Sequence, residues 1–257
     1  MADPKCYVLV RGRNAKSYVE RCVQSILSQT YPNLTILFVD DASDYTKELQ
    51  KNLRSLLKHQ VVVWRKERYY SVRNAYELIH TYCEDPEAIV INLDADDWFS
   101  GPDSVSKIVE FYQRKKCVLS YGDCFIWSGH DDLHLPKASR AMALCNVAYP
   151  KKVIHERTYR DEPFYILHPR SWKVHAFTSV PLEAFQRGDG SWLQFCEDQA
   201  MFFPMLEMFG QHCAVNHTPT SVYNQANQAA DIKQHRLETL RDEIEIRRKP
   251  RYEPLYI

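Results

Sequence analysis

One stretch of this 257-residue chain decides its fold, Ala88-Ile89-Val90-Ile91-Asn92-Leu93-Asp94-Ala95-Asp96-Asp97. An apolar run of about six residues that ends in polar residues is typical of a strand buried on both faces of a parallel sheet. The carboxylates then emerge at the carboxyl edge, where open α/β sheets bind ligands. Crowded carboxylates repel one another unless a cation such as Mg²⁺ or Mn²⁺ lies among them. The stretch therefore predicts a metal–diphosphate site, although an Asp-rich strand end also makes an ordinary helix cap.

Composition disfavours several protein classes. Lys plus Arg equals Asp plus Glu at 33 each, so we expect no nucleic acid partner. No apolar stretch reaches the roughly 20 residues that span a bilayer, and the N-terminus lacks a signal-peptide pattern, so we expect a soluble, cytoplasmic protein without a transmembrane segment. Glycine is scarce, and the absence of a glycine-rich phosphate loop disfavours Rossmann dehydrogenases and P-loop enzymes. The 8 cysteines form no CxxC pair and are expected to be reduced core residues.

Strand-like and helix-like segments alternate through the first half of the chain. Short apolar runs predict the strands, and apolar residues at helical spacing predict the helices. The expected strands are 6–10, 35–39, 61–64, 88–93 and 117–121, and the expected helices lie within 15–29, 49–57, 72–83 and 103–115. Such alternation indicates right-handed crossovers, so we predict an α/β fold with a mostly parallel central sheet flanked by helices.

The second half of the chain is less regular. The regular spacing of apolar residues is lost from 129 to 160 and returns at 164–168. A long irregular segment of this kind is typical of a lid, a binding segment or a simple surface excursion. Residues 196–209 predict a Met- and Phe-rich core helix that ends at Gly210, a residue type that commonly follows helices. The charged segment 231–249 predicts a C-terminal helical arm whose few apolar residues are too sparse to bury deeply.

Six short motifs follow one another along the chain. They are Val10-Arg11-Gly12-Arg13-Asn14, Gln29-Thr30-Tyr31-Pro32-Asn33, Val39-Asp40-Asp41-Ala42-Ser43-Asp44, Ser71-Val72-Arg73-Asn74-Ala75, Leu93-Asp94-Ala95-Asp96-Asp97 and Cys196-Glu197-Asp198-Gln199. Their order and spacing resemble the family 2 inverting glycosyltransferases of GT-A fold, including the DxD motif and the late acidic pair of that family. Two positions depart from the pattern: Ala42 stands where the family often has glycine, and Tyr69-Tyr70 replace the glycine common before the "ARN" helix start.

The resemblance implies transfer of a sugar from a nucleoside-diphosphate donor, which we expect to be UDP-linked, to a hydroxyl acceptor on a glycan or glycoconjugate. Mn²⁺ or Mg²⁺ would assist the leaving diphosphate, held by Asp96 or Asp97 with His217 as a candidate further ligand. The implied donor-binding residues are Val10, Arg11, Arg13, Asp40, Asp41, Arg73, Asp94, Ala95 and Asp96. The implied acceptor-binding residues, which flank the acidic pair, are His168, Arg170, Trp172 and Trp192.

Inversion requires a base on the opposite face of the sugar. In the resemblance this base is Asp198, with Glu197 as the alternative, although the pair also suits an ordinary helix start. We expect one GT-A domain over 1–257, in which 1–122 bind the nucleotide sugar, 123–230 carry the acceptor site and the base, and 231–257 form the arm.

Two other functions compete with this one. A phosphatase of the haloacid dehalogenase type also uses DxD after a strand, but it expects the motif on its first strand, whereas here it follows the fourth. A catalytically degenerate nucleotide-sugar-binding module of a larger glycan-synthesis protein remains the open alternative.

Overall fold

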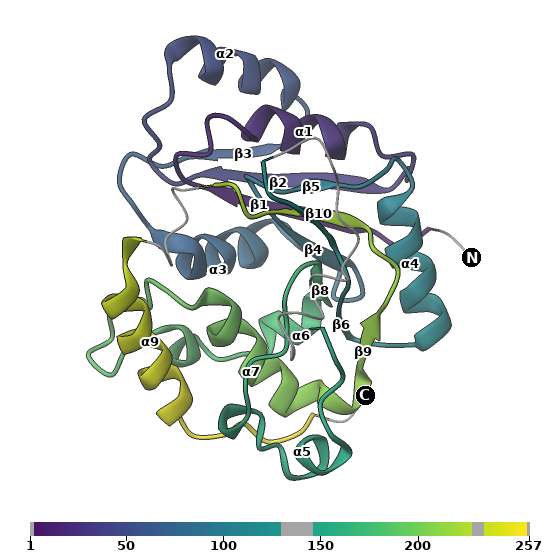
Figure 1. The fold of residues 1–257 in the computed structure, drawn as a ribbon, viewed down its shortest axis with the longest axis vertical. Coiled ribbons are helices and arrows are strands. Elements are labelled where there is room, and N and C mark those ends of the chain that lie inside the picture. The colour runs from purple at the N-terminus through teal and green to yellow at the C-terminus, as the bar shows by residue number, and fades with distance from the viewer. Residues whose placement is uncertain (1–2, 130–145, 228–233, 256–257) are drawn as a thin grey trace.

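The computed structural model describes residues 3–129, 146–227 and 234–255 (Figure 1). Its centre is a seven-stranded sheet with the strand order β3-β2-β1-β4-β8-β6-β9. In this sheet only β8 runs against the other strands. The strands are β1 (Cys6–Gly12), β2 (Leu34–Asp40), β3 (Val61–Trp64), β4 (Ile89–Asp94), β6 (Leu119–Gly122), β8 (Arg170–Lys173) and β9 (Cys213–Asn216). The predicted mostly parallel sheet is confirmed.

Helices cover both faces of this sheet and create two apolar cores. Neighbouring residues of β1 point to opposite faces, so Val8 packs in one core and Leu9 in the other. The Val8 core includes residues of α1 (Val19–Leu27), α2 (Lys47–Leu56) and α4 (Ser104–Lys115). The Leu9 core includes residues of α3 (Tyr70–Tyr82), α6 (Val174–Thr178) and α7 (Glu197–Phe209). Burial on both faces explains why these strands read as continuous apolar runs.

Several short elements have no counterpart in the sequence prediction. A second sheet, with the order β5-β10-β7, consists of β5 (Trp98–Phe99), β10 (Ser221–Asn224) and β7 (Phe125–Trp127). Strands of this length are too short to show a period. Three single turns of 3₁₀ helix also occur, η1 (Tyr159–Asp161), η2 (Leu182–Phe185) and η3 (Gly210–His212).

The regular element expected at 164–168 is absent, and the strand begins instead at Arg170. Backbone groups of the expected segment bond to a residue outside any sheet. Asn146 donates its N–H to the Tyr165 carbonyl at 2.6 Å, and its Oδ1 accepts from Leu167 N–H at 3.1 Å. These groups are therefore satisfied without a neighbouring strand.

Gly210 ends α7 for a reason other than the predicted one. Its φ is −61°, outside the left-handed region, and η3 continues directly from it. A Cβ at this position would lie 1.9 Å from the Tyr159 hydroxyl oxygen. Glycine is required here by close packing against Tyr159.

The C-terminal arm is the helix α9 (Arg236–Arg248), which packs beside α7 (Figure 1). Its apolar residues Leu237, Leu240 and Ile244 are exposed, at 79%, 51% and 41%, whereas Ile246, at 1%, and Asp242, at 0%, are buried. An ordinary surface helix shows the reverse pattern. The arm therefore docks largely through polar contacts.

Two further expectations concern the chain as a whole. All seven cysteines in the described ranges are free, as predicted for reduced core residues. Across those same ranges, no helix combines the length and the apolar character that crossing a bilayer demands.

Candidate active site

The carboxyl edge of β4 is also the edge at which β8 begins. In the register of the sheet, Arg11 of β1 lies opposite Asp94, and Asn92 lies opposite Arg170. Because β8 runs antiparallel to β4, its first residue lies beside the last residues of β4. The topology thus gathers charged side chains from three distant parts of the sequence.

Two buried arginines connect the end of β4 with the acidic pair at the start of α7. Arg11 Nη2 lies 3.7 Å from Asp94 Oδ1 and 3.8 Å from Glu197 Oε1. Arg170 Nη2 lies 3.8 Å from Asp94 Oδ2 and 3.5 Å from Glu197 Oε1. Arg170 Nη1 lies 3.6 Å from Asp198 Oδ2. One guanidinium therefore bridges the strand end and both members of the acidic pair.

Beside these arginines lies a trio of residues with suitable atoms for a cation. Asp94, Asp97 and His168 each place a ligand atom within 4.8 Å of the other two. His168 Nε2 is 3.6 Å from Asp94 Oδ2, and His168 Nδ1 is 3.7 Å from Asp97 Oδ2. The buried Nδ1 has no hydrogen-bond partner in the described part of the chain. Carboxylate oxygens with one imidazole nitrogen fit Mn²⁺ well, and Mg²⁺ less well because it prefers oxygen.

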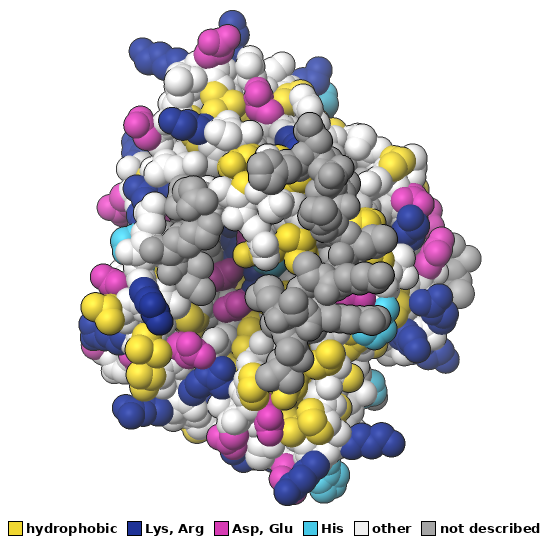
Figure 2. All heavy atoms as spheres, in the orientation of Figure 1, with side chains coloured by type: hydrophobic (Ala, Val, Ile, Leu, Met, Phe, Trp, Pro, Cys, Tyr) yellow, Lys and Arg dark blue, Asp and Glu magenta, His cyan; other side chains and the backbone are white. Residues whose placement is uncertain are grey.

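We call Arg11, Asp94, Asp97, His168, Arg170, Glu197 and Asp198 the central cluster. It contains four carboxylates against two guanidinium groups, which leaves an excess of negative charge if all four ionise. Figure 2 shows Asp and Glu side chains within a hollow near the middle of the face it presents.

Burial and neighbouring charges set the protonation of the trio. Burial, followed by the charges of Asp96 and Asp94, raises the pKa of Asp97 well above its ordinary value. Burial lowers the pKa of His168 to about 4, so the ring is neutral near pH 7, as a metal ligand must be. Burial tends to raise the pKa of Asp94, but His168 and the two arginines outweigh it and the pKa lies below its usual range. A dication would favour the ionised form of both carboxyl groups.

The acidic pair occupies the first turn of α7. Burial raises the pKa of Glu197, with Asp198 adding to the effect, and burial also raises the pKa of Asp198 although Arg170 opposes it. Asp198 Oδ1 accepts a hydrogen bond from Gln199 N–H at 2.8 Å. Just before the pair, Cys196 has a left-handed φ of 54°. A carboxylate with a raised pKa is suited to accept a proton near neutral pH.

Asp96 and His217 lie outside the trio. Asp96 Oδ2 accepts from Asn227 Nδ2 at 2.7 Å, and its carbonyl accepts from Asn224 Nδ2 at 3.1 Å. The His217 side chain is 70% exposed, with its Nδ1 3.2 Å from Asp123 Oδ2. Of the predicted ligands, the structure brings only Asp97 into the trio.

His168 and Arg170, predicted to contact an acceptor, belong to the central cluster, and their contact with an acceptor stays a prediction. For Trp172 the prediction of an acceptor contact is wrong, because the side chain is 0% exposed and packs on Phe177 and Phe202. Trp172 shares a sheet face with Arg170 but lies two residues further from the edge. Trp192 is half-buried against Tyr76, with the ring centroids 5.4 Å apart, and is not part of the cluster.

The end of β2 has one buried carboxylate oxygen without a hydrogen-bond partner among the residues described. Asp40 Oδ2 accepts from Ser43 N–H at 3.1 Å, whereas Oδ1 has no hydrogen-bond partner among the residues described. Burial raises the pKa of Asp40, and the charge of the exposed Arg13 opposes this. Asp40 and Arg13 therefore suit the predicted donor site.

Other predicted donor residues serve the scaffold in this structure. Both carboxylate oxygens of Asp41 accept backbone N–H groups, from Tyr69 at 2.7 Å and Tyr70 at 2.9 Å, and so hold the start of α3. Arg73 donates to Glu77 at 2.8 Å and stacks 3.6 Å over the Tyr69 ring. The side chains of two further predicted residues, Val10 and Ala95, are buried in the core.

Sequence reasoning missed the role of Asn92. This residue interrupts an apolar strand, is 1% exposed, and joins two members of the cluster. Its Oδ1 accepts from Arg11 Nη2 at 2.6 Å, and its Nδ2 donates to Asp94 Oδ1 at 3.2 Å. A polar residue inside a buried strand must find hydrogen-bond partners, which is the signal that the sequence offered.

Both departures from the family pattern adopt the backbone conformation that glycine favours. Ala42 has φ 58° and Tyr70 has φ 61°. For an L-residue the left-handed region costs roughly 1–2 kcal/mol. We expect Ala42→Gly to stabilise the protein by about 0.5–1 kcal/mol, because relief of this strain exceeds the added entropy of the unfolded chain. Urea denaturation measures the change in the free energy of unfolding.

The matched control for Ala42→Gly is Ala75→Gly in the buried middle of α3. This change should lower the free energy of unfolding by at least about 1 kcal/mol, since glycine is unfavourable inside a helix. A loss of stability in both variants would show that Ala42 bears no relievable strain.

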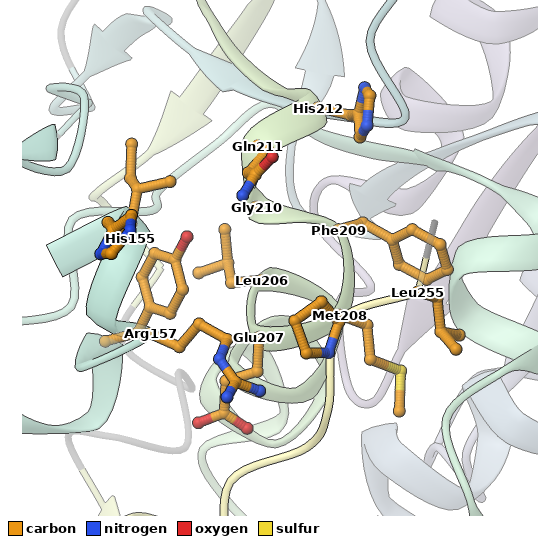
Figure 3. Close-up of a pocket in the computed structure, with 13 residues that line it drawn as sticks. His155, Arg157, Leu206, Glu207, Met208, Phe209, Gly210, Gln211, His212 and Leu255 are labelled. Carbon is orange, nitrogen blue, oxygen red and sulfur yellow. The ribbon is translucent and has the colours of Figure 1, made fainter. Parts of the chain in front are cut away.

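A second hollow lies apart from the central cluster (Figure 3). It is bounded by α5 (Lys151–Glu156), the end of α7 and the C-terminal residues around Leu255. Its one carboxylate, Glu207, is fully buried and forms a two-pronged pair with Arg160 at 2.6 and 2.9 Å. This hollow contains no member of the central cluster, so we place the candidate site at the cluster.

Comparison with known sequences assigns the family. The profile of glycosyl transferase family 2 matches residues 8–178, which include most of β1 and all of β2, β3, β4 and β8. The chain belongs to this family. One relative of this family 2 chain is TuaG of Bacillus subtilis (strain 168), named as a teichuronic acid biosynthesis glycosyltransferase, which is 26% identical over 119 residues. Another is the glycosyltransferase GlyA of Streptococcus pneumoniae serotype 4, which is 28% identical over 128 residues. The match to TuaG covers 46% of this chain and 46% of TuaG. The match to GlyA covers 47% of this chain and 17% of GlyA, so each match spans less than half of the relative's length.

Solved structures confirm the fold of this family 2 glycosyltransferase. TarS 1-349 of S. aureus superposes with a TM-score of 0.60 at 13% identity, covering 86% of this chain and 60% of that one. The mannosyltransferase PcManGT of Pyrobaculum calidifontis superposes with a TM-score of 0.61 at 16% identity, covering 96% and 64%. The predicted GT-A fold is therefore confirmed.

Proposed function

We propose that this chain transfers a sugar from a UDP-linked donor to a hydroxyl group of a glycan or glycoconjugate, with inversion at the anomeric carbon. One observation carries the proposal: Arg170 lies 3.8 Å from Asp94 of the metal-suited trio and 3.6 Å from Asp198. Groups suited to the leaving diphosphate and to the attacking alcohol thus flank a single side chain.

Donor binding would use the carboxyl edges of β2 and β4. The unpaired Oδ1 of Asp40 would accept a hydrogen bond from the N–H of a uracil ring or from a ribose hydroxyl. Asp94, Asp97 and His168 would hold the cation. When bound, a dication at this place offsets the negative charge that develops on the departing diphosphate.

The proton of the acceptor would pass to Asp198. Its raised pKa brings it nearer to the working pH, which favours general-base catalysis. Glu197 approaches both arginines and would mainly keep them in place. Arg170, between Asp94 and Asp198, reduces the repulsion between a base and a diphosphate site of like charge.

The ligands of fold relatives support this proposal. TarS has been crystallised with UDP-GlcNAc and with UDP, and PcManGT with GDP-Man and Mn²⁺. We further propose that residues 1–257 act as one catalytic domain, since β8 and β9 of the second half pair into the same sheet as β1 to β4.

A sugar-nucleotide panel tests the function. We expect Mn²⁺-dependent turnover of a UDP-sugar in preference to GDP-mannose, and a product whose anomeric configuration, measured by NMR, is opposite to that of the donor. Retained configuration would contradict single displacement. If the chain binds a donor but transfers its sugar to none of the acceptors tested, the result would instead support the degenerate binding module.

A further inference from the structure

The segment that carries Glu197 and Asp198 is held from outside by α9. Residues 193–196 have no regular secondary structure, and Cys196 adopts a left-handed φ of 54° just before α7. Such a conformation persists only where surrounding contacts determine it. The contacts that hold this segment therefore decide where the acidic pair points.

Asp242 of α9 supplies the main contacts. Its side chain is 0% exposed, and its Oδ2 accepts the backbone N–H groups of Gln194 at 2.9 Å and Phe195 at 3.0 Å. Arg187 donates to the same carboxylate, from Nε at 2.9 Å and from Nη2 at 2.8 and 2.9 Å. The carboxylate is thus fully occupied, which is how a buried charge is tolerated.

Two neighbours of Asp242 on α9 extend this contact to both sides of the acidic pair. Cys196 Sγ donates to the Thr239 carbonyl at 3.3 Å, and Gln199 Nε2 donates to Glu243 Oε1 at 2.9 Å. Residues 239, 242 and 243 lie on one face of the helix. This inward face is polar except for the buried Ile246, and Leu237, Leu240 and Ile244 lie on the exposed side of the helix.

We propose that Asp242 is a positioning residue that fixes the orientation of Asp198 by anchoring the 194–196 segment. The proposal rests on the proposed function for its effect on transfer. Misplacement of a reacting group by about 1 Å costs on the order of 100-fold in rate. The contacts of Asp242 lie three and four residues before the base, so their loss allows displacements of this size.

The test compares Asp242→Asn and Asp242→Ala with the wild-type chain. We expect kcat per folded molecule to fall about tenfold for the Asn variant, which keeps one acceptor oxygen, and about 100-fold for the Ala variant. The donor KM and the directly measured donor Kd should stay within about twofold, because Asp242 contacts no residue of the donor site. Hydrogen exchange of the 194–199 peptide should accelerate in the same order.

Glu207→Gln is the control. This change weakens the buried ion pair between Arg160 and Glu207. Arg160 also donates a hydrogen bond to the Ile246 carbonyl of α9, so the control affects the contact between α7 and α9 but not residues 194–196. We expect lower stability but unchanged kcat per folded molecule and unchanged exchange at 194–199. Equal losses of kcat in the control and the Asp242 variants would overturn the positioning role.

Unchanged exchange at 194–199 in both Asp242 variants would also overturn the positioning role, whatever the activity. If Asp242→Ala does not fold, the Asn variant still decides the question. The absence of transfer by wild-type chain with every donor would instead refute the proposed function, and the exchange measurement would still report whether Asp242 anchors the segment.

Discussion

Replacing Asp198 with asparagine is expected to lower kcat by about 10²–10⁴-fold while leaving the affinity for a UDP-sugar unchanged. Asparagine preserves the shape of the side chain and the hydrogen bond to Gln199 N–H, but it cannot accept the acceptor's proton. Stopped assays for transfer and calorimetry for donor binding measure the two quantities separately. A change confined to kcat indicates that an interaction used only in the transition state was removed.

The pH dependence follows from the direction of the pKa shift. A base acts in its ionised form, so wild-type kcat should fall as pH drops through the raised pKa of Asp198. This acid limb should be missing from the residual activity of Asp198→Asn. The matched control is Asp103→Asn at the start of α4, where the carboxylate is likewise next to a helix N-terminus but pairs with the exposed Lys107 and lies outside the central cluster. If Glu197→Gln loses turnover and Asp198→Asn keeps it, the base is Glu197.

His168→Gln is expected to remove most of the Mn²⁺ binding, whereas His217→Gln should have no effect. His168 lies within the trio, while His217 is exposed and pairs with Asp123. The loss should be at least the roughly tenfold to 100-fold drop in affinity seen when an outer partner of a metal ligand is removed. Calorimetric titration of MnCl₂ in the presence of UDP measures the affinity.

Thermal unfolding gives an independent measurement of the same site. A cation that binds only the folded state stabilises it by about 2.7 kcal/mol at 100 times its Kd. Chelation should therefore lower the Tm of the wild type and of His217→Gln, but not that of His168→Gln. Asp96→Ala is the third variant, because the DxD resemblance implies Asp96 or Asp97 as the ligand, and of these two only Asp97 belongs to the trio that could hold a cation. Full Mn²⁺ affinity in His168→Gln, with loss in Asp96→Ala, would show that Asp96 binds the cation and that His168 does not.

Local pattern was sufficient to predict the first half of the fold. A strand covered on both faces must be apolar throughout, so the composition of strands 35–39 and 88–93 showed that they are buried. The helices between them were recognised from apolar residues at helical spacing. The pattern failed at 164–168, where Asn146 satisfies the backbone. It also missed the short strands β5, β7 and β10, since two to four residues show no period.

The candidate site was predictable in part. The DxD stretch and the acidic pair were found because each is a compact motif, and the structure brings them to the same two arginines. The ion pairs of Arg11 and Arg170 could not be predicted, since neither residue shows in the sequence which carboxylates it meets. Trp172 was misjudged because an aromatic residue near a predicted base gives no sign of its depth in the sheet.

The chain by itself determined which segments are buried, where carboxylates end a strand and where an acidic pair opens a helix, because these properties depend on neighbours along the backbone. Only the tertiary structure decided that β8 runs against β4, which brings His168 and Arg170 beside Asp94, and that α9 presents Asp242 to the segment before Asp198. Contacts of this kind join residues that are far apart in sequence. A buried charge must be paired, and its partner comes within reach only when the whole chain has folded.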